Sequence, residues 1–442
     1  MATDPNEPGR SGRETRIKNT PPFSSTAITG VFRPHVLGCG WHGTLYPVPA
    51  FRPFRALRYA ADDLHPLVAP PYDVLSDADV DALQARSEHN ITRVDVPRGG
   101  SDRYRQAASL FQDWRHTGVL VTDEVPSYTL YRMRFTDASG TARDITGVVG
   151  GLEITDEGAG GVLPHERTTP KAATDRLDLT RATRANLSPV WGLSLASGLT
   201  RLLAEPGEPL GRVTEDGVEH IVERVTDPDR IAAIQRVLAA DDVLIADGHH
   251  RYSVSRTYRD DVRAATGNHD TPAEQTLTFV NELVADQLSV DAIHRLYADI
   301  ELPDLTAALA RSFTMTQLGR PTADTLAAMQ REGFLVLVAA DGVWRLDPHP
   351  GRFDGVRALD GAWLETALAD VALAVTYQHG MSAALAEVAA GRVTAAVLIR
   401  PVSVAEIERT AREGLLMPPK STFFTPKLKT GFVLRSLDGP IQ

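Results

Sequence analysis

The sequence predicts a mixed α/β fold, of the α+β kind, in a packed globular protein. The 442 residues are 43% hydrophobic and 23% charged, an ordinary composition for a chain with a core. Short apolar runs alternate with helical patterns and turn signals. A helix, a strand and a second helix are expected in succession around the loop Asp247–Arg251, where ligands bind in many α/β proteins. The length predicts two or three cooperating units.

The overall composition argues against several classes of protein. A formal net charge of -11 disfavours a general duplex-DNA binder, because phosphates require a clustered Lys/Arg surface. The single cysteine, Cys39, can form neither an intramolecular disulfide nor a cysteine-based zinc site. No apolar stretch approaches the roughly 18 residues of a membrane span, and the first residues lack the apolar region of a signal peptide. We therefore expect a cytoplasmic protein without membrane contact.

The chain divides by composition into a tail and three regions. Residues 1–47 are rich in Pro, Gly, Ser, Thr and Arg and predict a disordered tail. An N-terminal α/β region is expected over 48–205, a region with the Asp247–Arg251 loop over 206–300, and a C-terminal α/β region over 301–442. The sequence leaves the oligomeric state open, a homodimer included.

Local signals predict the elements of the first half. Ser76 and Asp79 have the spacing of a capping box and begin a short helix toward Glu88. A second helix is expected over 104–117. Alternating runs from 127 and 145 predict a β-hairpin turning at 138–140, and the Asp-Gly pairs at 216–217 and 341–342 predict two more hairpins.

The segment from Asp227 predicts a helix, because its apolar residues recur on one face. It leads into a strand over 243–246, and helical character resumes over 252–265. Beyond Thr276 the expected order is strand, strand, helix, strand, helix, strand, with a last strand from Phe432.

The loop Asp247–Arg251 is the strongest candidate for chemistry. Gly248 lets a ligand approach the backbone, and the N–H groups of a helix start attract anions. His249, His250 and Arg251 add donors suited to phosphate oxygens. Asp247 could hold magnesium or accept a proton. The alternative is a glycine turn whose histidines cap a helix. Adjacent histidines do not by themselves make a zinc site.

A second candidate segment runs over 165–186. It supplies His165 and Glu166 as candidate acid–base groups, Lys171 and Arg176 as phosphate ligands, and Asn186 as a substrate ligand. Only a thin apolar face is available to a helix here, so most of these polar groups are expected outside the core. A surface helix with salt bridges would look similar.

A third segment, 417–431, contains three prolines that favour a rigid binding loop. Lys420, Ser421 and Thr422 are its candidate phosphate ligands. The upstream glycines of a Walker A loop are missing. A structural loop that covers a sheet edge is the alternative.

Two shorter runs supply further candidate substrate ligands. The first contains Tyr72 and Asp73 after a Pro-Pro turn. The second contains His89 and Asn90 before a strand-like run that ends at Asp95. Each could be only a turn or, at Asn90, a helix C-cap.

These motifs together resemble a known family. VPAFRPFRALRY, APPYDVLS, HNITRV, HERT with KAATDR, ADGHHRY and PPKSTFFTPKL resemble domain of unknown function 1015, over roughly Val48 to Leu437. The resemblance implies a ParB/sulfiredoxin-like core over 206–300, in which a glycine-containing loop ending in arginine binds nucleotide phosphates. Gly248–Arg251 would be that loop. Free serine kinases belong to the same superfamily, so nucleotide binding is implied first and phosphoryl transfer second.

The departures from that superfamily narrow the hypothesis. A sulfiredoxin needs a cysteine in the loop, where this chain has His249, and the helix-turn-helix of partition proteins is not recognisable. We therefore expect a small-molecule kinase that uses ATP or ADP with Mg²⁺ and acts on a hydroxyl metabolite such as serine. Glu166 would take the hydroxyl proton, and Asp247 would position the metal. A non-catalytic nucleotide sensor and a phosphate-ester hydrolase are the alternatives.

Overall fold

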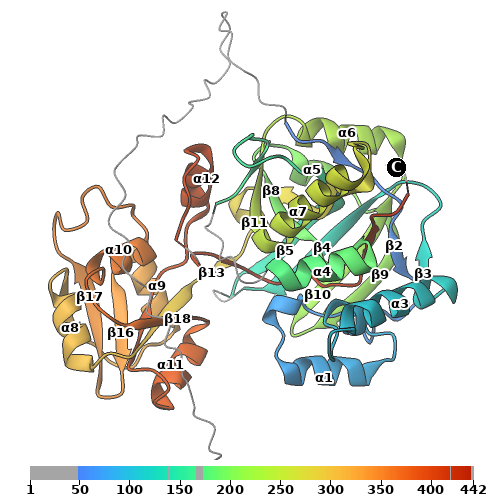
Figure 1. The fold of residues 1–442 in the computed structure, drawn as a ribbon. Helices are drawn as coiled ribbons and strands as arrows, with labels where there is room; N and C mark the ends of the chain where they lie inside the picture. The colour runs from blue at the N-terminus through green and yellow to red at the C-terminus, as the bar shows by residue number, and fades with distance from the viewer. Residues whose placement is uncertain (1–47, 138–139, 166–172, 419, 440–442) are drawn as a thin grey trace, which may run out of the picture. The chain divides into compact units, whose positions relative to one another are not determined.

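The computed structural model describes residues 48–137, 140–165, 173–418 and 420–439. Its fold is mixed α/β, as the sequence predicts, with two large sheets and helices packed on them (Figure 1). The predicted tail with Cys39 lies outside the described residues, as do Glu166 and Lys171. Within the described ranges, no helix combines the length and apolarity needed to cross a bilayer.

The first sheet has nine strands, most of them antiparallel. Its order is β6 (Val162–Leu163), β11 (Val243–Asp247), β8 (Val190–Ser194), β12 (Gln275–Glu282), β5 (Ala142–Glu153), β4 (Tyr128–Thr136), β10 (Val218–Val225) and β9 (Glu208–Glu215), with β1 (Phe51–Arg52) also paired to β5. The predicted hairpins β4–β5 and β9–β10 are confirmed. The sheet takes strands from 51 to 282 and so crosses the boundary expected at 205–206.

Both faces of this sheet are buried, and successive residues of one strand show it. On β4, Leu130 packs into one apolar cluster and Tyr131 into the other. On β5, Val148 and Val149 divide in the same way. This alternation follows from the two-residue period of a strand, and it requires helices or loops on each face.

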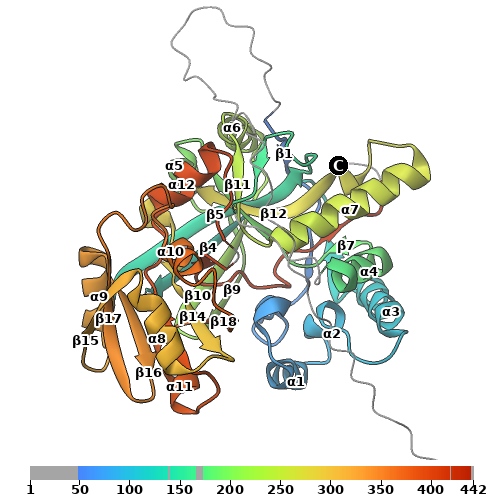
Figure 2. The ribbon, with the colours of Figure 1, turned by 60° about the vertical axis from the view of Figure 1, so that its left-hand side comes forward.

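Helices cover the first sheet. They are α1 (Asp77–Arg86), α2 (Thr92–Asp95), α3 (Arg103–His116), α4 (Ala173–Thr183), α5 (Leu199–Leu203), α6 (Pro228–Leu238) and α7 (His249–Thr266). The predicted capping box of Ser76 and Asp79 begins α1. The helices expected over 104–117 and from Asp227 are confirmed as α3 and α6. Helices α3, α4 and α7 pack in series beside the sheet (Figure 2).

The second sheet has six antiparallel strands. Its order is β15 (Phe313–Gln317), β17 (Gly342–Pro348), β16 (Leu335–Ala339), β19 (Ala395–Leu398), β14 (Ile293–Ala298) and β18 (Ala374–His379). The hairpin predicted at 341–342 joins β16 to β17. Helices α8 (Leu302–Ala310), α9 (Ala323–Glu332), α10 (Asp360–Ala367) and α11 (Met381–Ala389) accompany it. The predicted element order beyond Thr276 agrees with the structure up to β16, apart from a two-residue strand at 290–291. It omits the elements between 360 and 424, because short elements carry little periodic signal.

The chain after the second sheet returns to the first. Helix α12 (Val404–Arg412) is followed by β20 (Phe423–Phe424), which pairs with β13 (Val290–Asp291). The last strand, β21 (Arg435–Ser436), pairs with β7 (Ala185–Asn186), so the strand expected from Phe432 has only two residues. A short pair of β2 (Leu57–Tyr59) and β3 (Leu120–Thr122) completes the pairings. This return places the 417–431 segment beside the Asp247–Arg251 loop.

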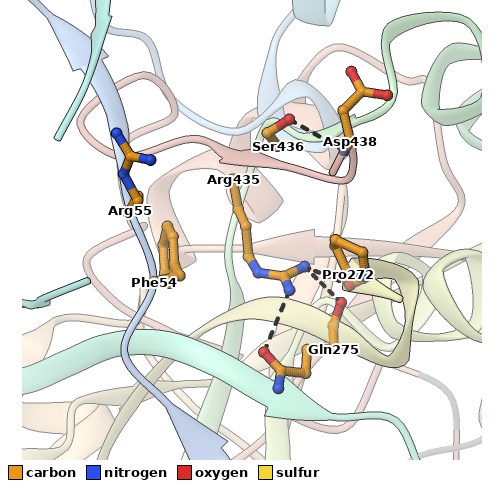
Figure 3. A pocket seen from close by; sticks show the side chains of 7 residues that line it. All are labelled: Phe54, Arg55, Pro272, Gln275, Arg435, Ser436 and Asp438. Carbon is orange, nitrogen blue, oxygen red and sulfur yellow. Dashed lines mark hydrogen bonds between the residues drawn. The ribbon is translucent and has the colours of Figure 1, made fainter. Parts of the chain in front are cut away.

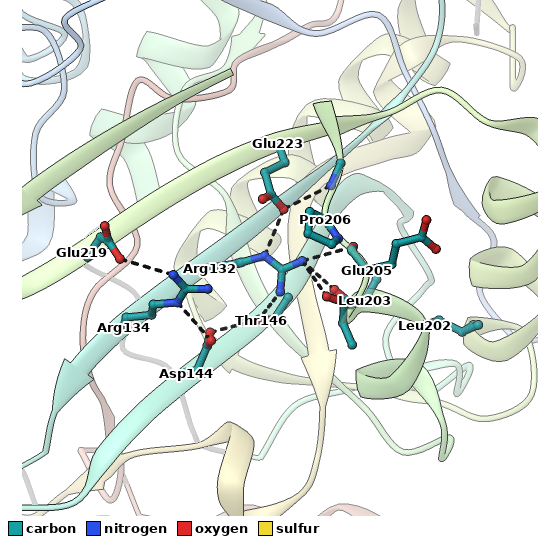
Figure 4. Close-up of polar contacts among 12 residues, drawn as sticks. Arg132, Arg134, Asp144, Thr146, Leu202, Leu203, Glu205, Pro206, Glu219 and Glu223 are labelled. Atoms are coloured by element: carbon teal, nitrogen blue, oxygen red, sulfur yellow. Dashed lines mark hydrogen bonds and ion pairs between the residues drawn. The ribbon is translucent and has the colours of Figure 1, made fainter. Parts of the chain in front are cut away.

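Two buried arginines fasten elements of the first sheet. Arg132 lies 3.0 Å from Glu223, donates to Thr146 at 3.1 Å and caps the end of α5 through the Leu203 carbonyl at 2.8 Å (Figure 4). Arg435 donates at 2.9 Å to the carbonyls of Pro272 and Gln275 beside a small cavity (Figure 3). Arg132 donates through Nε, NH1 and NH2, and Arg435 donates through NH1 and NH2, to backbone and side chains of the fold, so we assign both a structural role.

Candidate functional site

The turn between β11 and α7 depends on one glycine. Strand β11 is buried except at its last residue, Asp247, which is half-buried. Helix α7 starts at His249 and runs for 18 residues. Between them Gly248 has φ 85° and ψ 29°, a left-handed conformation that favours glycine. A Cβ atom at Gly248 would lie 3.0 Å from Nε of Arg251. The glycine therefore permits both the sharp turn and the packing of the arginine over it.

Arg251 is the charge at the centre of this turn, and its side chain is only 10% exposed. Its NH2 group lies 3.1 Å from Asp247 and 3.7 Å from Asp73, which belongs to the 3-10 turn η1 (Tyr72–Val74). NH1 donates to the carbonyl of Pro189. Nε has no hydrogen-bond partner among the described residues. One donor of a buried guanidinium is thus left for a ligand or for a neighbour outside those residues.

Asp247 is held by two cations. In addition to Arg251, Lys427 places its ammonium nitrogen 3.3 Å from the carboxylate, and the same ammonium lies 4.1 Å from the ring centre of Phe423. Burial alone would raise the pKa of Asp247, but the charges of Lys427 and Arg251 outweigh it and keep that pKa far below its usual value. Asp247 is therefore ionised at neutral pH.

Two histidines, one fully buried and one half-buried, lie beside the turn. His165 is fully buried, with Nδ1 2.6 Å from the carbonyl oxygen of Ile245 and Nε2 2.8 Å from the hydroxyl of Thr422. Its ring centre lies 4.9 Å from that of His249, the first residue of α7. Burial lowers the pKa of His165 to about 4 and that of His249 to about 3, so both rings are neutral at pH 7. Most polar groups of 165–186 were expected outside the core, and His165 is one that lies inside it.

A pocket opens on the other side of Arg251, with an empty volume of about 440 Å³ that includes open solvent. The guanidinium of Arg176 stacks on the ring of Tyr72 at 4.3 Å and donates at 2.7 Å to Asp175. The pocket takes its lining from η1, α2, α4, β7, α7 and β12: Tyr72, Asp95, Arg176, Leu179, Thr180, Ala185, Asn186, Leu187, Ser188, Arg251, Val254, Ser255 and Thr276.

Asp95 is the acid of this pocket, and it was not among the predicted site residues. It is 4% exposed and ends α2, a helix where a strand-like run was expected. Arg176 donates at 2.6 Å to its carbonyl oxygen, and Ser188 hydrogen-bonds its carboxylate. Burial raises the pKa of Asp95 above its usual value, although Arg176 opposes the shift. The one sequence signal was an acidic residue at the end of the strand-like run Ile91-Thr92-Arg93-Val94.

The described residues offer few metal ligands. No group of three or more His, Cys, Asp or Glu side chains that could hold a metal ion occurs among them. Asp247 contributes one carboxylate, and its charge is already matched by Lys427 and Arg251. Magnesium is usually bound through one or two carboxylates together with substrate phosphates. The described residues therefore fit a magnesium ion that is held mainly by substrate phosphates, with Asp247 as its one carboxylate ligand.

A family model described as "Protein of unknown function (DUF1015)" matches residues 51–362, which include the Asp247–Arg251 loop and the lining of the pocket. The chain belongs to this family. No relative is found among curated proteins.

Several solved structures resemble this DUF1015 chain weakly. A conserved hypothetical protein from Pyrococcus furiosus has 10% identity and a TM-score of 0.35, with 62% of this chain and 91% of that chain covered. A free serine kinase in complex with AMP has 11% identity and a TM-score of 0.34, with 61% and 88% covered. SbnI with a C-terminal truncation, from Staphylococcus aureus, has 10% identity and a TM-score of 0.36, with 65% and 87% covered. TM-scores this low assign no residue a role.

The DUF1015 chain brings most of the predicted site residues to the two sides of Arg251. His165, His249 and Thr422 lie on the side of the β11–α7 turn. Tyr72, Arg176 and Asn186 line the pocket. The Oδ1 atom of Asn186 also accepts from the Leu277 amide at 3.1 Å, so part of its role is to hold β12.

Other predicted residues are bound into the fold. Asn90 is fully buried and donates to the Pro66 carbonyl at 2.8 Å. It is not a helix C-cap, because α1 ends at Arg86. The ring of His89 packs edge-on against Trp114, and neither His89 nor Asn90 lines the pocket.

The 417–431 loop meets the turn mainly through Thr422 and Lys427. Ser421 is buried and donates to the Pro418 carbonyl at 2.8 Å, while the Lys420 carbonyl accepts from Arg295 at 3.0 Å. Lys427 was not among the predicted ligands, although it belongs to the same loop. Its contact with Asp247 could not be predicted from local patterns, because the two residues lie far apart in the sequence.

Proposed function

We propose that this DUF1015 protein binds a nucleotide by its phosphates at the N-terminus of α7 and transfers a phosphoryl group to a small hydroxyl metabolite, such as serine, in the adjoining pocket. The observation that carries the proposal is the position of Arg251. Its guanidinium belongs to the β11–α7 turn through Asp247 and also lines the pocket. A phosphoryl group held at Arg251 would face both the rest of the nucleotide and an acceptor.

The turn has the features that phosphate binding requires. The first amides of a long helix are unsatisfied by the helix itself and carry a partial positive charge. Gly248 removes the side chain that would obstruct an approach, and Lys427 and Arg251 supply full positive charges. His249 and His250 are then donors at the same helix start, and Lys420, Ser421 and Lys171 are proposed ligands around them.

Magnesium has a limited place in this proposal. Asp247 would contact a magnesium ion that is otherwise held by nucleotide phosphates, and the ion would supply charge neutralisation of the phosphates. The ammonium of Lys427 now lies 3.3 Å from the Asp247 carboxylate. If the carboxylate contacted the ion, Lys427 would pair with the phosphates instead.

The pocket supplies groups suited to an acceptor. Its lining includes the stacked pair of Tyr72 and Arg176 and the apolar side chains of Leu179 and Val254. Glu166 is proposed as the base that takes the acceptor's hydroxyl proton, since it directly follows His165 in the chain. Asp95 is the described carboxylate that lines the pocket, and it is the second candidate for that base.

Ligand-dependent unfolding tests the binding step. Thermal melting with ATP, ADP and CTP, with and without magnesium, should show a higher Tm with the bound nucleotide, because a ligand specific for the folded state adds about 2.7 kcal/mol at one hundred times its Kd. No shift with any nucleotide would refute the proposal. Phosphorus NMR of ATP with a pool of hydroxy acids then separates the outcomes: a new phosphoester signal supports a kinase, inorganic phosphate alone supports a hydrolase, and binding without turnover supports a sensor.

A further inference from the structure

The hydroxyl of Thr422 and the imidazole of His165 form a hydrogen bond, and the structure shows which of the two is the donor. The carbonyl oxygen of Ile245 can only accept, so His165 Nδ1, 2.6 Å away, must carry a proton. In the neutral ring Nε2 then has no proton and must accept. The hydroxyl of Thr422, 2.8 Å from Nε2, is therefore the donor. Thr422 cannot donate the same hydrogen to a phosphate, which changes the role expected of it.

This arrangement is that of an activated hydroxyl. A hydroxyl donates to a base, and a third group orients the base by accepting from its other nitrogen. Here the orienting group is the backbone of β11, two residues before Asp247. The base is fully buried, whereas Thr422 is half-buried, so the threonine is the more exposed member of the pair.

The pair also lies where the proposed phosphates would bind. His165 packs at 4.9 Å against His249, the first residue of α7. Lys427 follows Thr422 by five residues in the same loop and contacts Asp247. Burial holds the pKa of His165 near 4, which leaves Nε2 unprotonated at neutral pH and makes its protonated form short-lived.

We propose that Thr422 is a nucleophile activated by His165 and that it accepts a phosphoryl group from the bound nucleotide. This phosphoryl step rests on the proposed function; the nucleophilic character of Thr422 does not. A bond forms between Thr422 Oγ1 and the terminal phosphorus, and the bond from that phosphorus to its bridging oxygen breaks. The bridging oxygen leaves with the electron pair as part of the nucleoside diphosphate. The hydroxyl proton passes to His165 Nε2 and then, by way of a phosphate oxygen of the product, to solvent. The product is a phosphothreonine.

Two reagents test this inference on the full chain. The first is ATP with magnesium and no acceptor, followed by peptide mass spectrometry after rapid quenching. The expected result is phosphothreonine at position 422, with one nucleoside diphosphate released per modified chain. The second is a fluorophosphonate probe without nucleotide, in which the attacking oxygen replaces fluoride on phosphorus. It should label Thr422 as well.

Matched variants separate the nucleophile from its surroundings. Thr422→Val keeps the shape and should lose both labels, whereas Thr422→Ser should retain them. Thr425→Val is the control, because Thr425 lies in the same loop but its hydroxyl is 3.1 Å from Ser289 and not from a histidine. It should label like the parent. His165→Gln should slow labelling by about 10²-fold or more, the usual contribution of a positioned base.

The outcomes are distinct. Labelling of Thr422→Val at the parent rate, or no fluorophosphonate label on the parent, would overturn the nucleophile. A fluorophosphonate label together with nucleotide binding, but without phosphothreonine, would overturn the phosphoryl step and leave direct transfer to the acceptor. A fluorophosphonate label without any nucleotide-dependent change in Tm would support the nucleophile and refute the proposed function instead.

Discussion

The guanidinium of Arg251 lies 3.1 Å from the carboxylate of Asp247, four residues earlier in the chain, and packs over Gly248, where an added Cβ would lie 3.0 Å from its Nε. This contact fixes the orientation of the arginine before any ligand arrives. It also keeps the carboxylate ionised. A site arranged in this way loses little conformational entropy on binding, which is the advantage of preorganisation.

Gly248→Ala should reduce both stability and nucleotide binding. The left-handed backbone costs an alanine about 1 kcal/mol, and the added Cβ would lie 3.0 Å from Nε of Arg251 and displace it. Gly267→Ala is the matched control, because Gly267 has φ 65° at the other end of α7 and a Cβ added there would meet no atom within 4 Å. Both variants should lower the Tm, but only Gly248→Ala should weaken nucleotide binding by titration calorimetry. Equal binding by the two variants would contradict this account.

Arg176→Lys should raise the KM of the acceptor and leave nucleotide binding unchanged. Lysine keeps the charge but loses the planar group that stacks on Tyr72 at 4.3 Å and donates twice to Asp175. Arg181→Lys is the control on the same helix, where the arginine pairs with Asp261 at an exposed position. Steady-state kinetics with varied acceptor would show the difference. A lower affinity for nucleotide in Arg176→Lys would mean that the pocket belongs to the nucleotide.

Much of the fold could be predicted from local signals. The Asp-Gly turns, the capping box at Ser76 and the glycine before α7 each act over a few residues, and the structure confirms them. The contact of His165 with Thr422 joins residues 257 positions apart, so no local pattern could predict it. The burial of Asp95 could not be predicted for a similar reason: its partners lie on α4 and in the loop before β8, and not among its neighbours in sequence.

Stability should fall between pH 7 and pH 5 because of the buried histidines. The pKa values of His165 and His249 are lowered to about 4 and about 3, so below about pH 6.5 the unfolded chain binds protons that the folded chain does not. The stabilisation from these neutral rings is complete above the unfolded pKa and is lost as the pH falls toward the folded values. Urea midpoints measured from pH 7.5 to 5 should decrease accordingly.

His165→Gln should make that pH profile less steep, since glutamine does not titrate. Part of the slope should remain, because burial also lowers the pKa values of His249, His220 and His294. His116→Gln is its control, because His116 is exposed on α3 and its substitution should leave the slope unchanged. If His165→Gln kept the parent slope, His165 would bind a proton equally well in the folded and the unfolded chain, and burial would not hold its imidazole neutral.

The identity of the base can be decided between Glu166 and Asp95. Glu166→Gln should lower turnover by about 10²- to 10⁴-fold and leave nucleotide binding intact, as expected for loss of a general base. Asp95→Asn should instead lower the Tm and raise the acceptor KM, because Asp95 is 4% exposed and is held by Arg176 and Ser188. Stopped-flow measurement of turnover at saturating acceptor distinguishes the two effects. Full turnover in Glu166→Gln, with loss in Asp95→Asn at saturation, would transfer the role of base to Asp95, the carboxylate that lines the pocket.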